Sequence, residues 1–437
     1  MKKETLKDLD IDIYSETLDS GLEVYLVPMK NVKRYFMTYA TRYGSLVTEF
    51  MPQGSKKMVK VPNGVAHFLE HKMFEQENGS NPFEFFGKSG TYVNASTGYE
   101  ATRYICSGMN NFEENLEYLI NFVNCPYFTD ENVEKEKGII IEELNMYKDN
   151  PESAIDNTTR FNLFHKDQHR YDIGGEVSDV EKITKEDLYL CYDNFYQPKN
   201  MFILIVGNFQ VEKTLQMIRQ LFKNRKTKYQ ELPKIKEYNE PYAVRKKQEI
   251  VHFNVEVPKL CYALKIKKSD LRVKNEYILD LYLNIILKIL FGNTSLFSDE
   301  AKANDLFSGF YYSFDSTDSY VVISFFSETK KQNELLQLIF DTLNKRGDII
   351  DEESFVRCRK TMIANMVKSS CYIDAVSDNI FDDLISYKKI IYDRVDIIRN
   401  LDYNSLINFS ERLTLDNNCM VSYVNKNDND FKFIDLK

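Results

Sequence analysis

The pattern of apolar and polar residues in the first half of the chain predicts strands interspersed with amphipathic helices. Runs rich in β-branched and aromatic residues, bounded by turn residues, predict strands at 23–28, 34–43, 91–97, 101–108 and 201–207. Apolar residues recur at helical spacing in other stretches, and these predict helices at 82–86, 112–124, from 129 to about 147 and from 184 onward. The first half therefore reads as an α+β domain.

The same order of elements returns in the second half. Strands are predicted near 249–257, 261–265, 309–314, 320–326 and 419–424, with helices at 276–290, 333–343 and 353–366. The two halves are separated by a polar stretch without apolar periodicity. We interpret the chain as a tandem duplication, with an N-terminal domain at 1–225, a linker at 226–244 and a homologous C-terminal domain at 245–437.

Composition narrows the class of protein and its location. The 437 residues carry a net charge of −9 without a concentrated basic stripe, which argues against nucleic acid as a partner. The first residues are charged where a signal peptide needs an apolar core, and we expect no apolar run of membrane-spanning length. Seven scattered cysteines without a C-x-x-C pair suit a reducing cytosol and argue against cysteine as a metal ligand. We therefore expect a cytoplasmic protein with neither nucleic acid nor membrane as partner.

Two of the five histidines stand four residues apart in a predicted helix that follows Asn63, its expected N-cap. This spacing puts His67 and His71 on one helix face, where both imidazoles can reach one ion. Glu70 flanks the same face and can reach a water on that ion. His-x-x-Glu-His is the inverted form of a common zinc-protease motif. The alternative is a pair of surface histidines beside a solvated glutamate, and a third ligand is needed to decide.

The helix from 129 to about 147 offers candidates for that ligand. Glu136 and Glu143 share a stripe with the apolar residues Val133 and Ile140. An unpaired carboxylate in such surroundings is costly, so both glutamates are expected to face a cation. Glu142 points elsewhere and is explained by solvation. The alternative is that Glu136 and Glu143 pair with surface lysines.

The remaining sequence features argue against a site elsewhere. His165 and His169 repeat the four-residue spacing, but the segment runs directly into the glycine-containing loop 172–175, so we do not assign them as ligands. The helix at 276–290 takes the place of the motif helix in the second half and contains no histidine. Packing of this fold therefore does not require the histidines of the first half.

With these motifs, nearly the whole chain resembles the pitrilysin family of zinc peptidases, which includes insulin-degrading enzyme and the mitochondrial processing peptidase. Residues 67–71 match the family signature, and 136–143 match the segment with its distal zinc-binding glutamate. Residues 92–97 resemble the edge strand on which the family holds substrate as an added strand, which implies substrate contacts at Asn94 and Ala95. The fold implied is two α/β-sandwich domains, each a mostly antiparallel sheet covered by helices, that form half of a clamshell.

The resemblance also implies roles for the site residues. One Zn²⁺ would be held by His67, His71 and Glu143, with one position left for water. Glu70 would act as the general base. Glu136 would support the site by orienting Glu143 or the motif helix. The expected activity is a zinc-dependent endopeptidase that hydrolyses extended or unfolded peptides.

One departure bears on the quaternary structure. In larger family members the half facing the zinc contributes an Arg and a Tyr, whereas here the region 296–312 has Tyr311 and Tyr312 but no arginine. The chain resembles the half-size bacterial members, so we expect a heterodimer with a homologous non-catalytic subunit, and a homodimer as the second choice. The functional alternative is a non-catalytic structural or assembly subunit, or a peptide-binding module, with the same fold.

Overall fold

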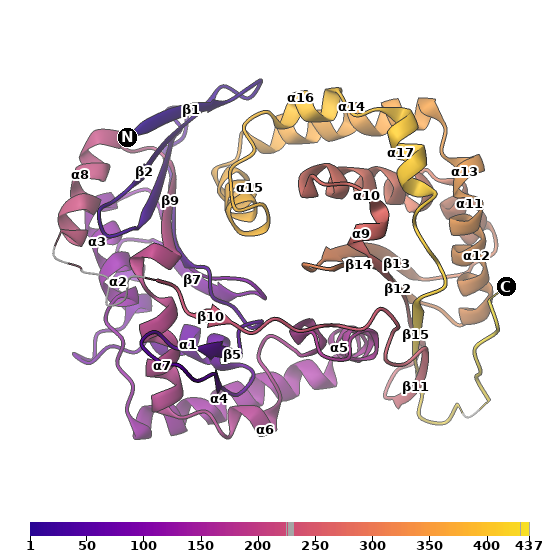
Figure 1. Cartoon of the computed structure of the whole chain (residues 1–437), viewed down its shortest axis with the longest axis horizontal. Coiled ribbons are helices and arrows are strands. Elements are labelled where there is room, and N and C mark those ends of the chain that lie inside the picture. The colour runs from indigo at the N-terminus through magenta and orange to yellow at the C-terminus, as the bar shows by residue number, and fades with distance from the viewer. Residues whose placement is uncertain (224, 226–230, 429, 437) are drawn as a thin grey trace. The chain divides into compact units, whose positions relative to one another are not determined.

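The computed structural model covers the whole chain and describes all residues except 224, 226–230, 429 and 437 (Figure 1). The chain folds into two compact units, and each contains segments from both halves of the sequence. Unit 1 consists of Met1–Leu144, Tyr171–Glu237 and Met366–Arg394; unit 2 consists of Asn145–Arg170, Tyr238–Asn365 and Val395–Lys437.

The predicted domains, 1–225 and 245–437, are consecutive in sequence, whereas the compact units are not. The division remains a prediction about the two homologous halves. Within the predicted linker, 226–230 lie outside the described residues, and Lys234–Ile235 form a short strand, β10, that pairs with β5 (Glu49–Met51).

Unit 1 is built on a seven-stranded sheet in the order β1-β2-β3-β9-β4-β8-β7. Neighbouring strands are antiparallel except β3 and β9, which run parallel. The strands are β1 (Lys2–Leu6), β2 (Ile11–Thr17), β3 (Glu23–Pro28), β4 (Tyr35–Thr41), β7 (Tyr92–Thr97), β8 (Thr102–Gly108) and β9 (Met201–Gly207). The sequence pattern missed β1 and β2, because β1 buries only Leu6 and otherwise reads as a charged, exposed segment.

Helices cover both faces of this sheet, so the central strands β4 and β9 are buried along their whole length. Alternate residues of a strand point to opposite faces. Ile203 and Ile205 accordingly join one core, and Phe202 and Leu204 join the other. Helices of the first core are α1 (Val65–Met73), α3 (Phe112–Val123), α4 (Asp130–Asp149), α7 (Lys185–Phe195) and α8 (Val211–Phe222).

The second face is covered by α15 (Ile373–Ser386), a helix from the C-terminal half of the sequence. Its apolar stripe includes Val376 and Ile380, and each buried side chain of this size contributes about 1.5–3 kcal/mol. Asp378 of α15 also accepts a hydrogen bond from Arg103 of β8 at 2.7 Å. The helix is therefore an integral part of unit 1.

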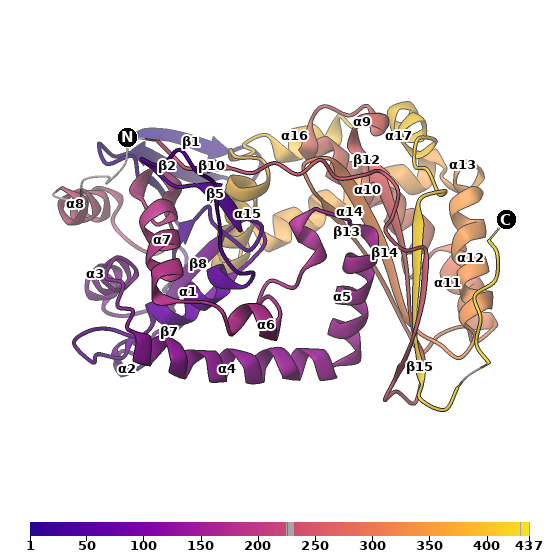
Figure 2. The same cartoon turned by 60° about the horizontal axis from the view of Figure 1, so that its bottom comes forward.

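Unit 2 repeats the topology of unit 1. Its five strands lie in the order β11-β15-β12-β14-β13, with β11 parallel to β15 and the other pairs antiparallel. This matches β3-β9-β4-β8-β7 in order and direction and confirms the predicted duplication. Figure 2 labels β12, β13, β14 and β15 of this sheet. The two halves of the sequence exchange one helix each. As α15 from the C-terminal half packs on the sheet of unit 1, so α5 (Pro151–Leu163), from the N-terminal half, packs on β12 and β15 of unit 2. The strands are β11 (Gln248–Phe253), β12 (Lys259–Lys267), β13 (Gly309–Ser316), β14 (Tyr320–Glu328) and β15 (Asn418–Asn425).

The helical stretch Glu276–Ala303 of unit 2 is long and apolar enough to cross a membrane by length and composition, which corrects our expectation from the sequence. Of its most apolar window, 67% is buried inside the protein, as in the core helix of a globular domain. This stretch contains α10 (Glu276–Phe291), the counterpart of the motif helix, and α11 (Leu296–Ala303).

The remaining elements are short strands, connecting turns and the outer helices of both units. They are β6 (Val59–Lys60), α2 (Pro82–Lys88), η1 (Gln168–Arg170), α6 (Val177–Val180), η2 (Pro198–Asn200), α9 (Lys268–Leu271), α12 (Gln332–Asn344), α13 (Arg346–Ile349), α14 (Glu352–Ser369), α16 (Arg394–Arg399) and α17 (Tyr403–Ser410).

Candidate metal centre

Helix α1 carries the histidine motif, and its start differs from the prediction. The N-cap is Gly64, in a left-handed conformation with φ 83°, and no side chain caps the helix. The Asn63 amide instead donates to Asp179 Oδ2 at 2.8 Å. Glycine is required at 64 because a Cβ there would lie 2.1 Å from the carbonyl oxygen of Gly174. Asn63 therefore ties the start of α1 to α6 and does not cap the helix.

The buried face of α1 determines where its polar face lies. Phe68 and Leu69 are fully buried in the core of unit 1. His67 and His71 lie off that face with side chains 14% and 23% exposed, and their ring centroids are 4.6 Å apart. Apolar packing of one face thus holds both imidazoles side by side at the surface of the core.

Glu143 of α4 completes a cluster of three ligand groups. Its Oε2 atom lies 3.5 Å from His71 Nε2 and 3.9 Å from His67 Nε2. Ligand atoms around a tetrahedral zinc ion are about 3.3–3.6 Å apart, given bonds of about 2.0–2.2 Å. Among the described residues, this is the one group of at least three His, Cys, Asp or Glu side chains close enough to share a metal ion. Two imidazoles and a carboxylate fit zinc with small side-chain movements.

Glu136 lies two helical turns before Glu143 on α4 and faces the other ring nitrogen of His71. Its Oε1 atom lies 3.1 Å from His71 Nδ1. Burial is the largest single effect and favours the neutral forms of both groups. The hydrogen bond and the neighbouring charges together outweigh it, so the pKa of His71 is raised and that of Glu136 is lowered. Both glutamates thus contact imidazoles, in place of the lysines that the alternative interpretation required. The exposed Glu142 agrees with the predicted solvation.

Glu70 is oriented by a residue that the sequence did not single out. Thr97, the last residue of β7, donates a hydrogen bond from Oγ1 to Glu70 Oε2 at 2.8 Å. Burial raises the pKa of Glu70, and the Thr97 hydrogen bond partly opposes this effect. The strand pattern alone could have placed Thr97 on β7, but only the packing of β7 against α1 brings it to Glu70.

His67 is electrostatically distinct from His71. Burial, followed by the nearby His71, lowers the pKa of His67 to about 4. A neutral imidazole is the form that binds metal. Its Nδ1 atom is buried and has no hydrogen-bond partner.

Strand β7 lies at one end of the sheet, so its outer edge pairs with no other strand in the described part of unit 1. Asn94 is exposed and Ala95 is half-buried. The Ala95 N–H donates to the side-chain oxygen of Asn94 at 2.9 Å. An edge strand of this kind offers the main-chain groups that addition of a peptide strand requires.

His165 and His169, which we did not assign as metal ligands from the sequence, contact other groups within unit 2. His169 Nδ1 lies 2.6 Å from Asp167 Oδ1, and His165 Nε2 lies 3.2 Å from the carbonyl oxygen of Ala243. Neither belongs to the three-ligand cluster. These histidines have local hydrogen-bonding roles.

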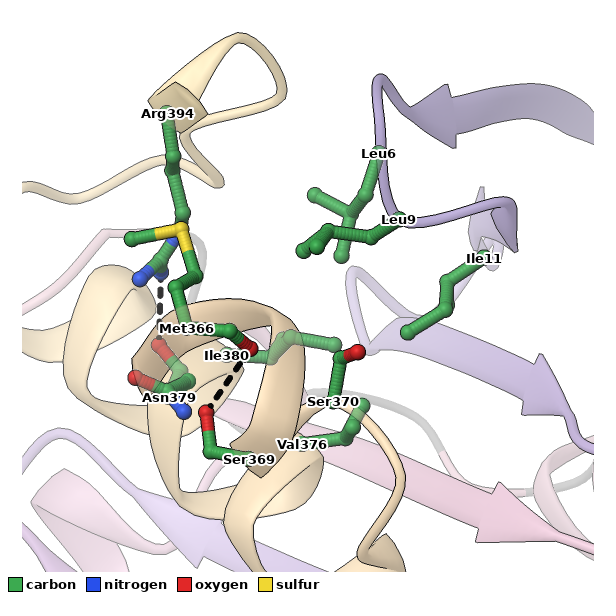
Figure 3. Close-up of a pocket in the computed structure, with 10 residues that line it drawn as sticks. All are labelled: Leu6, Leu9, Ile11, Met366, Ser369, Ser370, Val376, Asn379, Ile380 and Arg394. Atoms are coloured by element: carbon green, nitrogen blue, oxygen red, sulfur yellow. Dashed lines mark hydrogen bonds between the residues drawn. The ribbon is translucent and has the colours of Figure 1, made fainter. Parts of the chain in front are cut away.

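A separate apolar pocket in unit 1 is too small to be a ligand site. Figure 3 shows the N-terminal hairpin with Leu6, Leu9 and Ile11 facing α14 and α15. The cavity measures about 20 Å³, room for about one water molecule. It represents imperfect packing between the hairpin and the exchanged helix.

Sequence comparisons identify the family to which this geometry belongs. Residues 46–174 match the profile described as Insulinase (Peptidase family M16), and residues 182–362 match the profile described as Peptidase M16 inactive domain. All the site residues described above lie within the first match.

Individual relatives agree with the profiles. The uncharacterized zinc protease YmfH of Bacillus subtilis is 37% identical over 371 residues, which cover 83% of this chain and 85% of that protein. The zinc protease PqqE of Helicobacter pylori is 26% identical over 220 residues, 48% of this chain and 47% of the relative.

Solved structures show the same fold. The crystal structure of an M16-like peptidase from Alicyclobacillus acidocaldarius superposes with a TM-score of 0.88 at 29% identity, covering 96% of this chain and all of that one. Pitrilysin, at 16% identity, shares the fold alone, with a TM-score of 0.75 over 97% of this chain and 46% of its own. The chain belongs to the pitrilysin family, peptidase family M16.

Proposed function

We propose that the chain is a zinc-dependent endopeptidase that hydrolyses extended or unfolded peptides. The observation that carries this proposal is the convergence of His67, His71 and Glu143, with all three ligand atoms within 4.8 Å of one another, beside the half-buried carboxylate of Glu70. The zinc proteases among the relatives support the choice of metal and reaction.

The residues divide the work of peptide hydrolysis. Zinc held by His67, His71 and Glu143 would supply a Lewis acid that polarises the peptide carbonyl and lowers the pKa of water. Glu70 accepts the proton of the attacking water and then passes it to the leaving amine. The raised pKa of Glu70 favours both steps, because a carboxylate whose pKa is closer to neutral pH both accepts and returns a proton readily.

Substrate is held as an added strand on the open edge of β7. Main-chain pairing with Asn94 and Ala95 would select an extended peptide, because a folded segment cannot present its backbone to a strand edge. Peptides methylated on the backbone nitrogens that pair with β7 should bind more weakly than unmodified peptides of the same sequence. Equal KM values for both peptides would argue against this mode of binding.

The quaternary structure and location are part of the same proposal. The chain matches 46% of pitrilysin and 48% of PqqL from Escherichia coli in fold, about half the length of each. We propose that a homologous, non-catalytic subunit supplies the remaining substrate-binding groups in a heterodimer, with a homodimer as the second choice. Seven unpaired cysteines are compatible with a cytoplasmic protein.

The decisive experiment replaces the general base and leaves the ligands intact. The protein, purified with any bound partner, is assayed for zinc content by mass spectrometry and for cleavage of unstructured peptides. Glu70→Gln should keep zinc and lose cleavage by several orders of magnitude, whereas the exposed Glu142→Gln should keep both. Cleavage by Glu70→Gln at the wild-type rate would refute the mechanism. A wild-type protein that binds no zinc would favour a non-catalytic structural or peptide-binding role.

A further inference from the structure

The two candidate histidine ligands differ in what faces their second ring nitrogen. His71 Nδ1 meets Glu136 Oε1 at 3.1 Å, whereas His67 Nδ1 is buried without a hydrogen-bond partner. A metal-binding imidazole almost always donates its other N–H to a carboxylate, a carbonyl or water, which fixes the tautomer and the ring orientation. An acceptor for His67 is therefore expected close by.

The loop 172–175 brings a carboxylate to this nitrogen. Asp172 Oδ1 accepts a hydrogen bond from the Gly174 N–H at 2.8 Å, which folds the loop back on itself. A Cβ placed on Gly174 would lie 3.3 Å from Asp172 Oδ1 and 3.5 Å from His67 Nδ1. Both atoms thus border the same position beside Gly174, and the side chain of Leu144 packs against it, with Cδ2 at 2.7 Å. The negative charge of Asp172 also acts to raise the pKa of His67, against the larger effect of burial.

The loop is held firmly against the start of α1. A Cβ on Gly64 would lie 2.1 Å from the Gly174 carbonyl oxygen, and one on Gly175 would lie 2.6 Å from the Asn63 carbonyl oxygen. Asn63 also donates to Asp179 beyond the loop, at 2.8 Å. These backbone contacts give Asp172 a fixed position relative to the helix that carries His67.

We propose that Asp172 is a positioning residue for His67, accepting a hydrogen bond from its Nδ1–H while Nε2 faces the metal. Each imidazole of the site then has its own carboxylate, Glu136 for His71 and Asp172 for His67. The role rests on the proposed zinc site. Gly174 also fits this arrangement, since a side chain there would meet Leu144, Asp172 and the His67 Nδ1 atom.

The test compares Asp172→Asn with Glu176→Gln, an exposed residue of the neighbouring segment whose replacement removes the same charge. Asparagine retains a side-chain oxygen for the Gly174 N–H, so the loop should keep its fold and the metal-free protein its urea unfolding midpoint. Zinc affinity, measured by competition with a chelator of known affinity, should fall about 10- to 100-fold in Asp172→Asn and remain at the wild-type value in Glu176→Gln.

The outcomes separate this role from the proposed function. Wild type and Asp172→Asn binding zinc equally tightly would overturn the role of Asp172 and leave the zinc site standing. A fall in affinity that is matched by Glu176→Gln would also overturn it, because the effect would then be one of net charge. A wild-type protein that binds no zinc would overturn the proposed function and this role with it.

Discussion

Replacing Gly64 by alanine should destabilise the start of α1 by more than the usual cost of a left-handed residue. An L-residue at φ 83° costs about 1–2 kcal/mol. In addition, the new Cβ would lie 2.1 Å from the Gly174 carbonyl oxygen, a backbone atom that cannot rotate away. Overpacking of this kind typically costs a further 1–3 kcal/mol or so. The total of about 2–5 kcal/mol is a large part of the stability of a typical domain, roughly 5–15 kcal/mol.

Gly79→Ala is the matched control, because Gly79 has a φ of 71° and no atom within 4 Å of its added Cβ. It should pay the conformational cost alone. Hydrogen–deuterium exchange of the peptides that contain positions 64 and 79, followed across a urea series, reports the local stability around each substitution without assuming that the two units unfold together. Gly64→Ala should also bind zinc more weakly, because relieving the clash with Gly174 moves the start of α1 and displaces His67. Equal losses in the two variants would refute the close contact between α1 and the loop at Gly174.

Two further predictions concern protonation in the site. Thr97→Val removes a hydrogen bond that lowers the pKa of Glu70, so the pKa of Glu70 should rise further. The acid limb of the kcat/KM profile should then move to higher pH. An unchanged acid limb would mean that the hydrogen bond between Thr97 and Glu70 is absent in the working enzyme. Although burial lowers it, the hydrogen bond to Glu136 and the nearby carboxylates raise the pKa of His71 overall and favour its imidazolium form. Zinc must displace the proton on Nε2, while the Nδ1–H stays bonded to Glu136, so binding near neutral pH should release protons, and calorimetry in buffers of different ionisation enthalpy measures how many. Glu136→Gln should weaken zinc binding about 10- to 100-fold and reduce the proton release, and wild-type values for both would contradict the assigned contact.

Local sequence pattern determined most of the elements and the centre of the site. The predicted strands at 23–28 and 201–207 coincide with β3 and β9, because each is an apolar run that ends at clear turn residues. The four-residue spacing of His67 and His71 was sufficient to place them side by side, since the period of a helix brings such residues together wherever the helix lies. The repeated order of strands likewise predicted the duplication, which the identical topology of the two sheets confirms.

Tertiary structure alone decided which distant residues complete the site. Thr97 reaches Glu70, and Asp172 and His67 both border Gly174, through packing between segments that leave no periodic signal in the sequence. Gly64 replaced Asn63 as the helix cap because of a close backbone contact with the loop at Gly174.

The exchange of α5 and α15 between the halves was hidden for the same reason. An amphipathic helix shows in its sequence that it must bury one face, but it does not show which sheet that face will cover. The sequence thus determined the elements and the core of the motif, while long-range packing determined the composition of each unit and the surroundings of the metal ligands.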